Sequence, residues 1–184
     1  MPFTPPSDPW HAWLPASPSA TPCRDWLTDR GSLTTRIRER CEHFAVQVVR
    51  QELLRPCHDE RAVLRLSSHE WAWVREVMLL ADGVPVVFAH SVLAQRHARG
   101  HWQMFARMGD KPLGAALFAD PRIARHPLHF RRIDARHPLF AQATVAAGIV
   151  HTPPTTLWAR RSLFSRSRQA LLVTEVFLPG LFRP

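Results

Sequence analysis

Two charged residues stand within apolar stretches whose composition is typical of β-strands. In the first stretch, alternation with a period of two places Arg75 on the same face as Trp71, Trp73, Val77 and Leu79. A guanidinium cannot shed its charge, so on an apolar face it needs a carboxylate, either from a side chain or from a bound anion. The pattern therefore predicts a structural ion pair or an anion-binding site at Arg75.

A second stretch places a carboxyl group in a similar environment. Glu175 shares its strand face with Leu171 and Val173, and the opposite face is also apolar. Poor solvation favours the protonated form of a carboxyl, which could then donate or accept a proton near neutral pH, unless an arginine keeps it ionised. Pairing with Arg160 or Arg161 is the alternative to a role in a ligand site.

Both residues should lie in β-hairpins, because turn signals separate the apolar runs. Asp82-Gly83 suits a two-residue type I′ turn, in which both central residues need a positive φ. A polar turn at 166–169 separates the last two runs. The predicted hairpins are 70–80 with 84–93, and 155–165 with 170–178.

The other predicted elements group around these hairpins rather than alternating with strands. They are a helix over 22–40 with a break at Gly31, a strand over 43–53, a connection over 94–112, a short helix over 113–118 and a strand over 123–133 interrupted at Pro127. Backbone amides at the start of the short helix should lack partners. About six strands, joined mainly by hairpins, predict an α+β domain with an antiparallel sheet.

Length and composition are consistent with one ordinary domain. The chain has 184 residues, of which 46% are hydrophobic. Seven prolines in residues 1–23 predict a Pro-rich arm, followed by a domain over 24–184. The formal net charge of +9 would suit nucleic acid, a membrane surface or a small anionic substrate.

Several classes of protein receive no support. No apolar run is long enough for a membrane helix, and the proline-rich start does not resemble a secretory signal, so we expect a cytoplasmic location. Eleven histidines occur without a zinc-binding spacing, so no metal site is expected. Neither a phosphate-binding glycine loop nor a G-x-S-x-G elbow is present.

Several short motifs follow one another in a fixed order over residues 24–179. They are Asp25-Trp26-Leu27, Ser32-Leu33-Thr34, Trp73-Val74-Arg75-Glu76-Val77 with Ala81-Asp82-Gly83, Lys111-Pro112-Leu113-Gly114 through Leu117-Phe118, Leu157 to Ser162, and Leu171 to Pro179. Together they resemble the chorismate pyruvate-lyase family of ubiquinone biosynthesis. The resemblance implies a cofactor-independent, monomeric lyase that converts chorismate to 4-hydroxybenzoate and pyruvate. It also implies a six-stranded sheet with helical flaps over a buried ligand.

The same resemblance implies which residues bind the substrate. The ligand-binding arginine of the family falls on Arg75 and its glutamate on Glu175, while its two main-chain contacts fall on Leu33 and Leu113. Arg75 is expected to anchor the ring carboxylate through a bidentate pair, with hydrogen bonds from the two amides. Glu175 is expected to face the ether oxygen, and later the hydroxyl oxygen, and to share a proton with the departing enolpyruvyl group.

Two other functions remain open, and the sequence departs from the family in places. A non-catalytic sensor of small aromatic acids could have the same fold, although no helix-turn-helix segment precedes the domain. A basic nucleic-acid-binding protein would suit the net charge, but Lys111 is the only lysine and no known motif occurs. The departures are the Pro-rich arm, the Arg- and His-rich segment 94–109, and Phe88-Ala89-His90.

Overall fold

The computed structural model describes residues 3–11 and 23–182 and contains one antiparallel sheet in that part of the chain. The strand order is β1-β2-β3-β7-β6-β4, and β5 also pairs with β6. The strands are β1 (Phe44–Leu54), β2 (Ala72–Ala81), β3 (Val84–Ala94), β4 (Ala124–Arg125), β5 (His129–Ile133), β6 (Leu157–Arg166) and β7 (Gln169–Phe177). The predicted α+β fold with an antiparallel sheet is confirmed.

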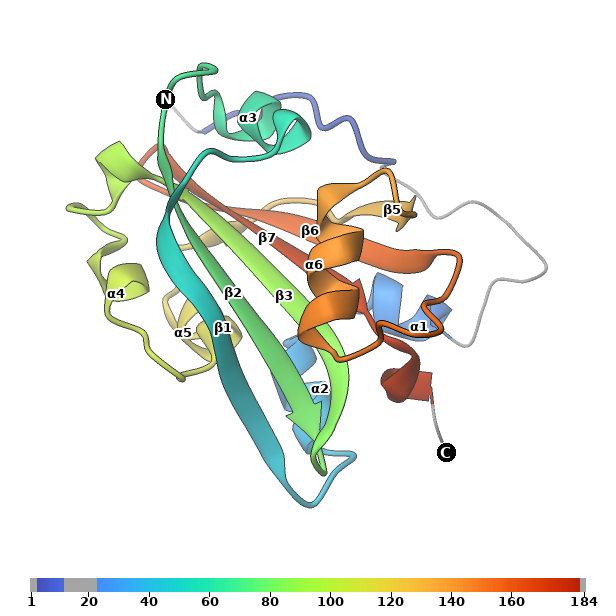
Figure 1. Cartoon of the computed structure of the whole chain (residues 1–184). Coiled ribbons are helices and arrows are strands. Elements are labelled where there is room, and N and C mark those ends of the chain that lie inside the picture. Colours follow the sequence, from blue (N-terminus) through green and yellow to red (C-terminus); the bar gives the residue numbers. More distant parts are fainter. Residues whose placement is uncertain (1–2, 12–22, 183–184) are drawn as a thin grey trace.

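The helices are short and lie in the connections between strands. They are α1 (Arg24–Thr28), α2 (Leu33–Arg38), α3 (His58–Leu64), α4 (Gln103–Ala106), α5 (Leu113–Ala119) and α6 (Pro138–Ala146), with 3-10 turns η1 (Gln95–His97) and η2 (Pro179–Phe182). Figure 1 shows α3 and α6 on one side of the sheet and α1, α2 and α5 on the other. We call the side of α1, α2 and α5 the front face, although it points away from the viewer in Figure 1, and the side of α3 and α6 the back face.

Both predicted hairpins are present, and their turns explain the registers. Asp82 and Gly83 have φ values of 49° and 79°, as a type I′ turn requires, and they join β2 to β3. Ser167 and Arg168 also have positive φ values, 47° and 67°, between β6 and β7. The central strands β3 and β7 then pair with each other, which brings the two hairpins into one sheet.

Some elements differ from the sequence-based expectation. Pro127 divides the predicted strand 123–133 into β4 and β5, so the sheet has seven strands rather than about six. The predicted break at Gly31 in the helix over 22–40 is confirmed, because Asp29–Ser32 leave the helical conformation and separate α1 from α2. The sequence analysis assigned no element to α3 or α6. Their signals are local, namely a capping box from Cys57 to Glu60 and Pro138 at the first turn.

Alternation along each strand divides the core between the two faces. Val77, Leu79 and Phe177 pack with α1 and α2 on the front face, whereas Met78 and Val176 pack with α6 on the back face. A charged side chain next in sequence to one of these residues points to the opposite face of the sheet. The face on which it lies determines which helices it can contact.

The segment 3–11 lies against the back of the sheet. His11 forms an isolated antiparallel bridge with Phe130 of β5, and the Trp10 side chain is 3% exposed. The rest of the predicted arm, residues 1–2 and 12–22, lies outside the described residues, so the boundary at residue 23 stays a prediction. No helix of the described residues is long and apolar enough to cross a membrane.

Candidate functional site

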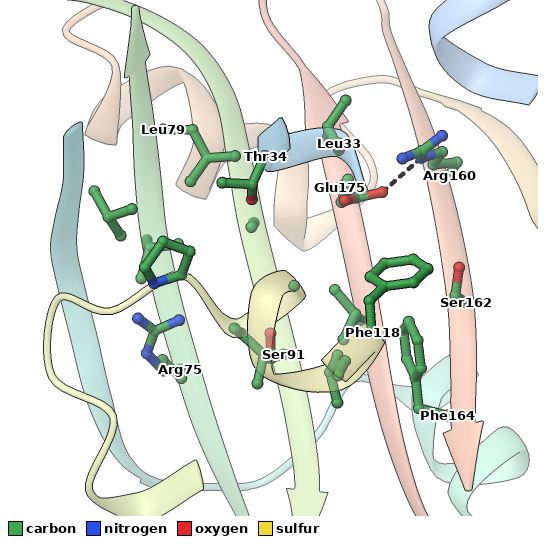
Figure 2. Close-up of a pocket in the computed structure, with 18 of the residues that line it drawn as sticks. Leu33, Thr34, Arg75, Leu79, Ser91, Phe118, Arg160, Ser162, Phe164 and Glu175 are labelled. Carbon is green, nitrogen blue, oxygen red and sulfur yellow. Dashed lines mark hydrogen bonds and ion pairs between the residues drawn. The ribbon is translucent and has the colours of Figure 1, made fainter. Parts of the chain in front are cut away.

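A pocket lies between the front face of the sheet and the helices α2 and α5 (Figure 2). Its space is about 600 Å³ when the opening to solvent is included. Strands β2, β3, β7 and β6 form its floor, and most of its wall is apolar. Its polar and charged side chains are those of Thr34, Arg75, Ser91, Arg125, Arg160, Ser162 and Glu175.

Arg75 is a deeply buried charge at one end of this pocket. Its side chain is 1% exposed, and Nη2 donates to the carbonyl oxygens of Gly109 at 2.8 Å and Lys111 at 3.0 Å. Nε is buried without a hydrogen-bond partner, and no carboxylate of the described residues forms an ion pair with Arg75. Burial lowers the pKa of Arg75, and the nearby charge of Asp110 opposes that effect. The guanidinium therefore has donors left for an anion.

Glu175 lies in the same pocket but has a protein partner. Arg160 Nε donates to Glu175 Oε2 at 2.5 Å, and Arg160 Nη1 donates to the carbonyl oxygens of Trp26 and Asp29, each at 2.7 Å. The predicted alternative of an ion pair is therefore realised with Arg160. Arg161 points to the back face, as alternation along β6 requires. The Glu175 side chain is still 17% exposed, so one edge of the carboxylate faces the pocket.

Leu33 and Leu113 begin the two helices that cover the pocket, and both line it. The first amides of a helix have no acceptor within it, so these two positions offer N–H groups to a ligand. Ser32 caps α2 by accepting from the amide of Thr35 at 3.3 Å. A Cβ at Gly114 would lie 3.5 Å from Thr34 Oγ1 and 3.6 Å from Ser32 Oγ, which is ordinary van der Waals contact, so α5 packs directly against the start of α2.

The sequence analysis missed one charged residue of the pocket. Arg125 donates from Nε and Nη2 to Ser162 Oγ at 3.1 and 3.0 Å, and from Nη1 to the carbonyl oxygen of Arg30 at 2.5 Å. Burial lowers the pKa of Arg125, while the charge of Glu175 raises it. Arg125 lies on β4, which has only two residues, so it carries no alternation pattern that could have placed it.

A family model described as "Chorismate lyase" matches residues 11–184. The chain belongs to the chorismate lyase family. It is 50% identical over 181 residues to a protein of Aromatoleum aromaticum named "Probable chorismate pyruvate-lyase", with 98% of this chain and 97% of that one covered. A protein of Nitrosospira multiformis with the same name is 48% identical over 171 residues, covering 92% and 93% of the two chains.

Solved structures of transcriptional regulators share the fold of this chorismate lyase family member. The effector domain of PhnF from Mycobacterium smegmatis has a TM-score of 0.55 at 16% identity, covering 81% of this chain and 89% of that one. The C-terminal domain of the histidine utilization repressor from Pseudomonas syringae has a TM-score of 0.55 at 10% identity, covering 77% and 96%. At these identities the likeness shows the fold alone.

A row of polar side chains crosses the back face of this family member, directly behind the pocket. Glu76, His90, Thr174 and Arg161 occupy neighbouring register positions on β2, β3, β7 and β6. All four side chains are at most 4% exposed. Each of the four is next in sequence to a residue that lines the pocket, namely Arg75, Ser91, Glu175 or Arg160. The row therefore fixes the strands that carry the pocket residues.

His90 is the centre of this row. Its Nδ1 lies 3.0 Å from Glu76 Oε1, and its Nε2 lies 3.0 Å from Glu60 Oε1 of α3. Burial alone would lower the pKa of His90, but the carboxylates of Glu60 and Glu76 outweigh it and raise that pKa to about 9. Arg50 completes the group by donating to Glu76 Oε2 at 2.7 Å. Two carboxylates, one imidazolium and one guanidinium give this group a balanced charge.

Arg161 holds the N-terminal segment at the other end of the row. It forms an ion pair with Asp8, and its Nη1 donates to Asp59 Oδ2 of α3 at 2.9 Å. Trp10 Nε1 donates to the same Asp59 oxygen at 2.8 Å. Burial would raise the pKa of Asp59, but hydrogen bonding to His137 and the charge of Arg161 hold it well below its usual range. Segment 3–11 is therefore part of the back layer.

Proposed function

We propose that this protein is a chorismate pyruvate-lyase that converts chorismate to 4-hydroxybenzoate and pyruvate in the front-face pocket. The observation that carries the proposal is Arg75, a buried guanidinium that has no carboxylate partner among the described residues and lines a mostly apolar pocket. Asp110 acts on Arg75 through its charge but forms no ion pair with it, and a buried charge without an ion-pair partner is costly, so a site of this kind favours an anionic ligand. Membership of the chorismate lyase family supports chorismate as that anion.

The proposed reaction balances without a co-reactant. The ether bond from the ring to the enolpyruvyl oxygen breaks, the ring loses the proton on the neighbouring carbon, and the enolpyruvyl group takes up a proton to become pyruvate. The ring becomes aromatic and keeps its hydroxyl group. Because aromatisation drives the reaction, holding the substrate in the reactive orientation can supply most of the catalysis. We therefore propose a cofactor-independent lyase.

Arg75 binds the ring carboxylate in this account, and Leu33 and Leu113 add hydrogen bonds from their amides. Arg75 presents planar donors that match a carboxylate bidentately. The apolar side chains of Val77, Leu79 and the two leucines then surround the ring. Exclusion of water from this pocket strengthens every charged interaction inside it.

Glu175 acts on the polar edge of the ring. Arg160 Nε donates to one oxygen of Glu175 and so fixes the position of its carboxyl group, which can accept a hydrogen bond or a proton. In this position it accepts from the ring hydroxyl and shares the proton that passes to the departing enolpyruvyl group. Arg160 has a positioning role, since it ties the carboxylate to the carbonyl groups at the end of α1.

The wider setting follows from the resemblance to the family. We propose that the enzyme is a monomer in the cytoplasm, that its partners are the substrate chorismate and the product 4-hydroxybenzoate rather than nucleic acid, and that the product is committed to ubiquinone. Light scattering of the purified protein should give the mass of one chain. Retention on heparin at physiological salt would contradict the part of the proposal that excludes nucleic acid.

The decisive experiment mixes the purified protein with chorismate in the presence of a chelator and follows both products. We expect 4-hydroxybenzoate and pyruvate in equal amounts, and loss of both in Arg75→Ala. Saturable binding of 4-hydroxybenzoate without turnover of chorismate would overturn the lyase and favour the sensor. Near-normal turnover by Arg75→Ala would overturn the role of Arg75.

A further inference from the structure

We propose that Arg125 binds the second carboxylate of a dicarboxylate substrate, which in chorismate is the carboxylate of the enolpyruvyl group. The inference rests on the proposed function and adds a substrate-binding residue to it. The residues in the family resemblance, Arg75, Glu175, Leu33 and Leu113, provide for only one carboxylate and one hydroxyl. Chorismate carries two carboxylates, so the second needs a partner of its own.

The charges that line the pocket are unbalanced. The described lining residues include three guanidinium groups, those of Arg75, Arg125 and Arg160, and one carboxylate, that of Glu175. Arg160 and Glu175 neutralise each other as an ion pair. Two positive charges remain, and a dianion would neutralise both. The product 4-hydroxybenzoate is a monoanion and would neutralise only one.

Arg125 has no carboxylate partner among the described residues. Its hydrogen bonds go to the hydroxyl of Ser162 and the carbonyl oxygens of Arg30 and Gly31. Glu175 and Asp29 lie near enough to act through their charges. Glu175 accepts from Arg160, however, and Asp29 accepts from Arg36 at 3.1 Å and from the Gly31 amide at 2.7 Å. A half-buried guanidinium bound only by neutral oxygens keeps its full charge for a ligand.

Donors remain on both Arg125 and Ser162. Nη2 of Arg125 carries two N–H groups and donates to Ser162 alone among the described residues. Ser162 Oγ accepts from Nε and Nη2 of Arg125, so its own O–H proton is left as a donor. Together these groups offer a carboxylate two hydrogen bonds, one of them from a charged group.

The position of Arg125 suits the part of chorismate that departs. Arg75 lies on β2 and Arg125 on β4, and the strands β3, β7 and β6 lie between them in the sheet, so the two arginines are on opposite sides of the pocket floor. In Figure 2, Ser162 and Phe118, both of which contact Arg125, lie across the pocket from Arg75. Arg125 also lines a second pocket with Arg30 and residues 126–128.

The test compares two stable ring compounds that differ only in the second carboxylate. 3-(Carboxymethoxy)benzoate has both carboxylates, and 3-methoxybenzoate has only the one that Arg75 would bind. We expect Arg125→Gln to weaken the binding of the dicarboxylate about tenfold to a hundredfold, and that of the monocarboxylate less than about twofold, by calorimetry. Arg125→Lys should recover part of the loss. Arg131→Gln on β5 removes an exposed charge outside both pockets and serves as the control.

Kinetics separate this inference from the proposed function. In Arg125→Gln we expect the KM for chorismate to rise about tenfold, while the Kd for 4-hydroxybenzoate stays within about twofold of the wild-type value. Equal losses for both ring compounds would show that Arg125 only braces the fold, and no loss would show that it does not face the ligand. Either result overturns the inference. If the wild type binds the dicarboxylate through Arg125 but leaves chorismate intact, the proposed lyase fails and the second carboxylate site stands.

Discussion

Arg75 and Glu175 line the same pocket from β2 and β7, with β3 alone between them. Arg75 pairs in register with Ser91 and Glu175 with Ala89, so the two residues are offset by two positions along β3. Two strand spacings of about 4.8 Å and the offset of about 7 Å together separate their backbones by about 12 Å. That span, reduced by two side chains reaching inward, suits a single aromatic ring with polar groups at opposite ends.

Glu175→Gln should lower the rate of chorismate turnover about a hundredfold. The amide keeps the size of the side chain but loses the charge that accepts the proton. The affinity for 4-hydroxybenzoate should also fall, since an amide is a weaker acceptor than a carboxylate. Steady-state kinetics and calorimetry measure the two effects. The exposed Glu52 of β1 provides the control Glu52→Gln, and an unchanged rate with unchanged product affinity in Glu175→Gln would remove the residue from the mechanism.

His90→Ala should destabilise the protein by about 3–5 kcal/mol. The substitution leaves the buried carboxylates of Glu60 and Glu76 close together without the positive charge between them. Urea unfolding followed by tryptophan fluorescence gives the free energy of unfolding. His69→Ala replaces an exposed histidine and should change it by less than about 0.5 kcal/mol. Similar free energies of unfolding for both variants would show that the charged group around His90 does not stabilise the protein.

The same group predicts how stability depends on pH. The pKa of His90 rises from 6.5 to about 9 on folding, so its contribution is complete below pH 6.5 and is lost as the pH rises through 9. The pKa values of Glu60 and Glu76 are lowered by His90 against the effect of burial, so their contribution is present above pH 4.5 and is lost in acid. The wild type should therefore lose stability between pH 6.5 and 9.

The control for this pH dependence is His90→Gln, which has no proton to lose. Its free energy of unfolding should change much less than that of the wild type between pH 6.5 and 9. A parallel decline in both proteins would assign the effect to other groups. Measuring the difference between the two curves removes contributions that they share, such as those of His97 and His126, whose pKa values are lowered by burial.

Gly114 offers a test of the contact between the two covering helices. Ala at this position meets only ordinary contacts, and within a helix it should add about 0.5–1 kcal/mol to the free energy of unfolding. Gly114→Leu would instead press on Thr34 and separate α5 from α2. We expect its affinity for 4-hydroxybenzoate to fall at least about tenfold while Gly114→Ala retains wild-type affinity. Equal affinities in both variants would mean that closure of these helices does not hold the ligand.

Local rules sufficed for the parts of the fold with strong patterns. The turn at Asp82-Gly83 and the alternation around Arg75 and Glu175 predicted two hairpins and two charges on one apolar face, and the structure has both. Which residues neutralise those charges depends on contacts far apart in the sequence. Arg160 meets Glu175 across a hairpin and meets the end of α1 across 131 residues, so alternation alone could offer the pairing only as an alternative.

The residues that the sequence analysis missed lie where patterns are short or their partners distant. Arg125 lies on a two-residue strand, and Asp59 lies on a helix whose start is marked only by a capping box. Each member of the polar row on the back face comes from a different strand, so no single strand shows the row as a pattern in its sequence. Only the register of the sheet brings Glu76, His90 and Thr174 into line.

Binding of the ring carboxylate by Arg75 is tested by comparing the affinities of the protein for 4-hydroxybenzoate and 4-hydroxybenzamide. The amide has the same shape but no charge. Calorimetry should show the wild type binding the carboxylate about tenfold to a hundredfold more tightly than the amide, and Arg75→Gln binding the two within about threefold of each other. If Arg75→Gln keeps the full preference for the carboxylate, another group binds it and the account of this pocket is wrong.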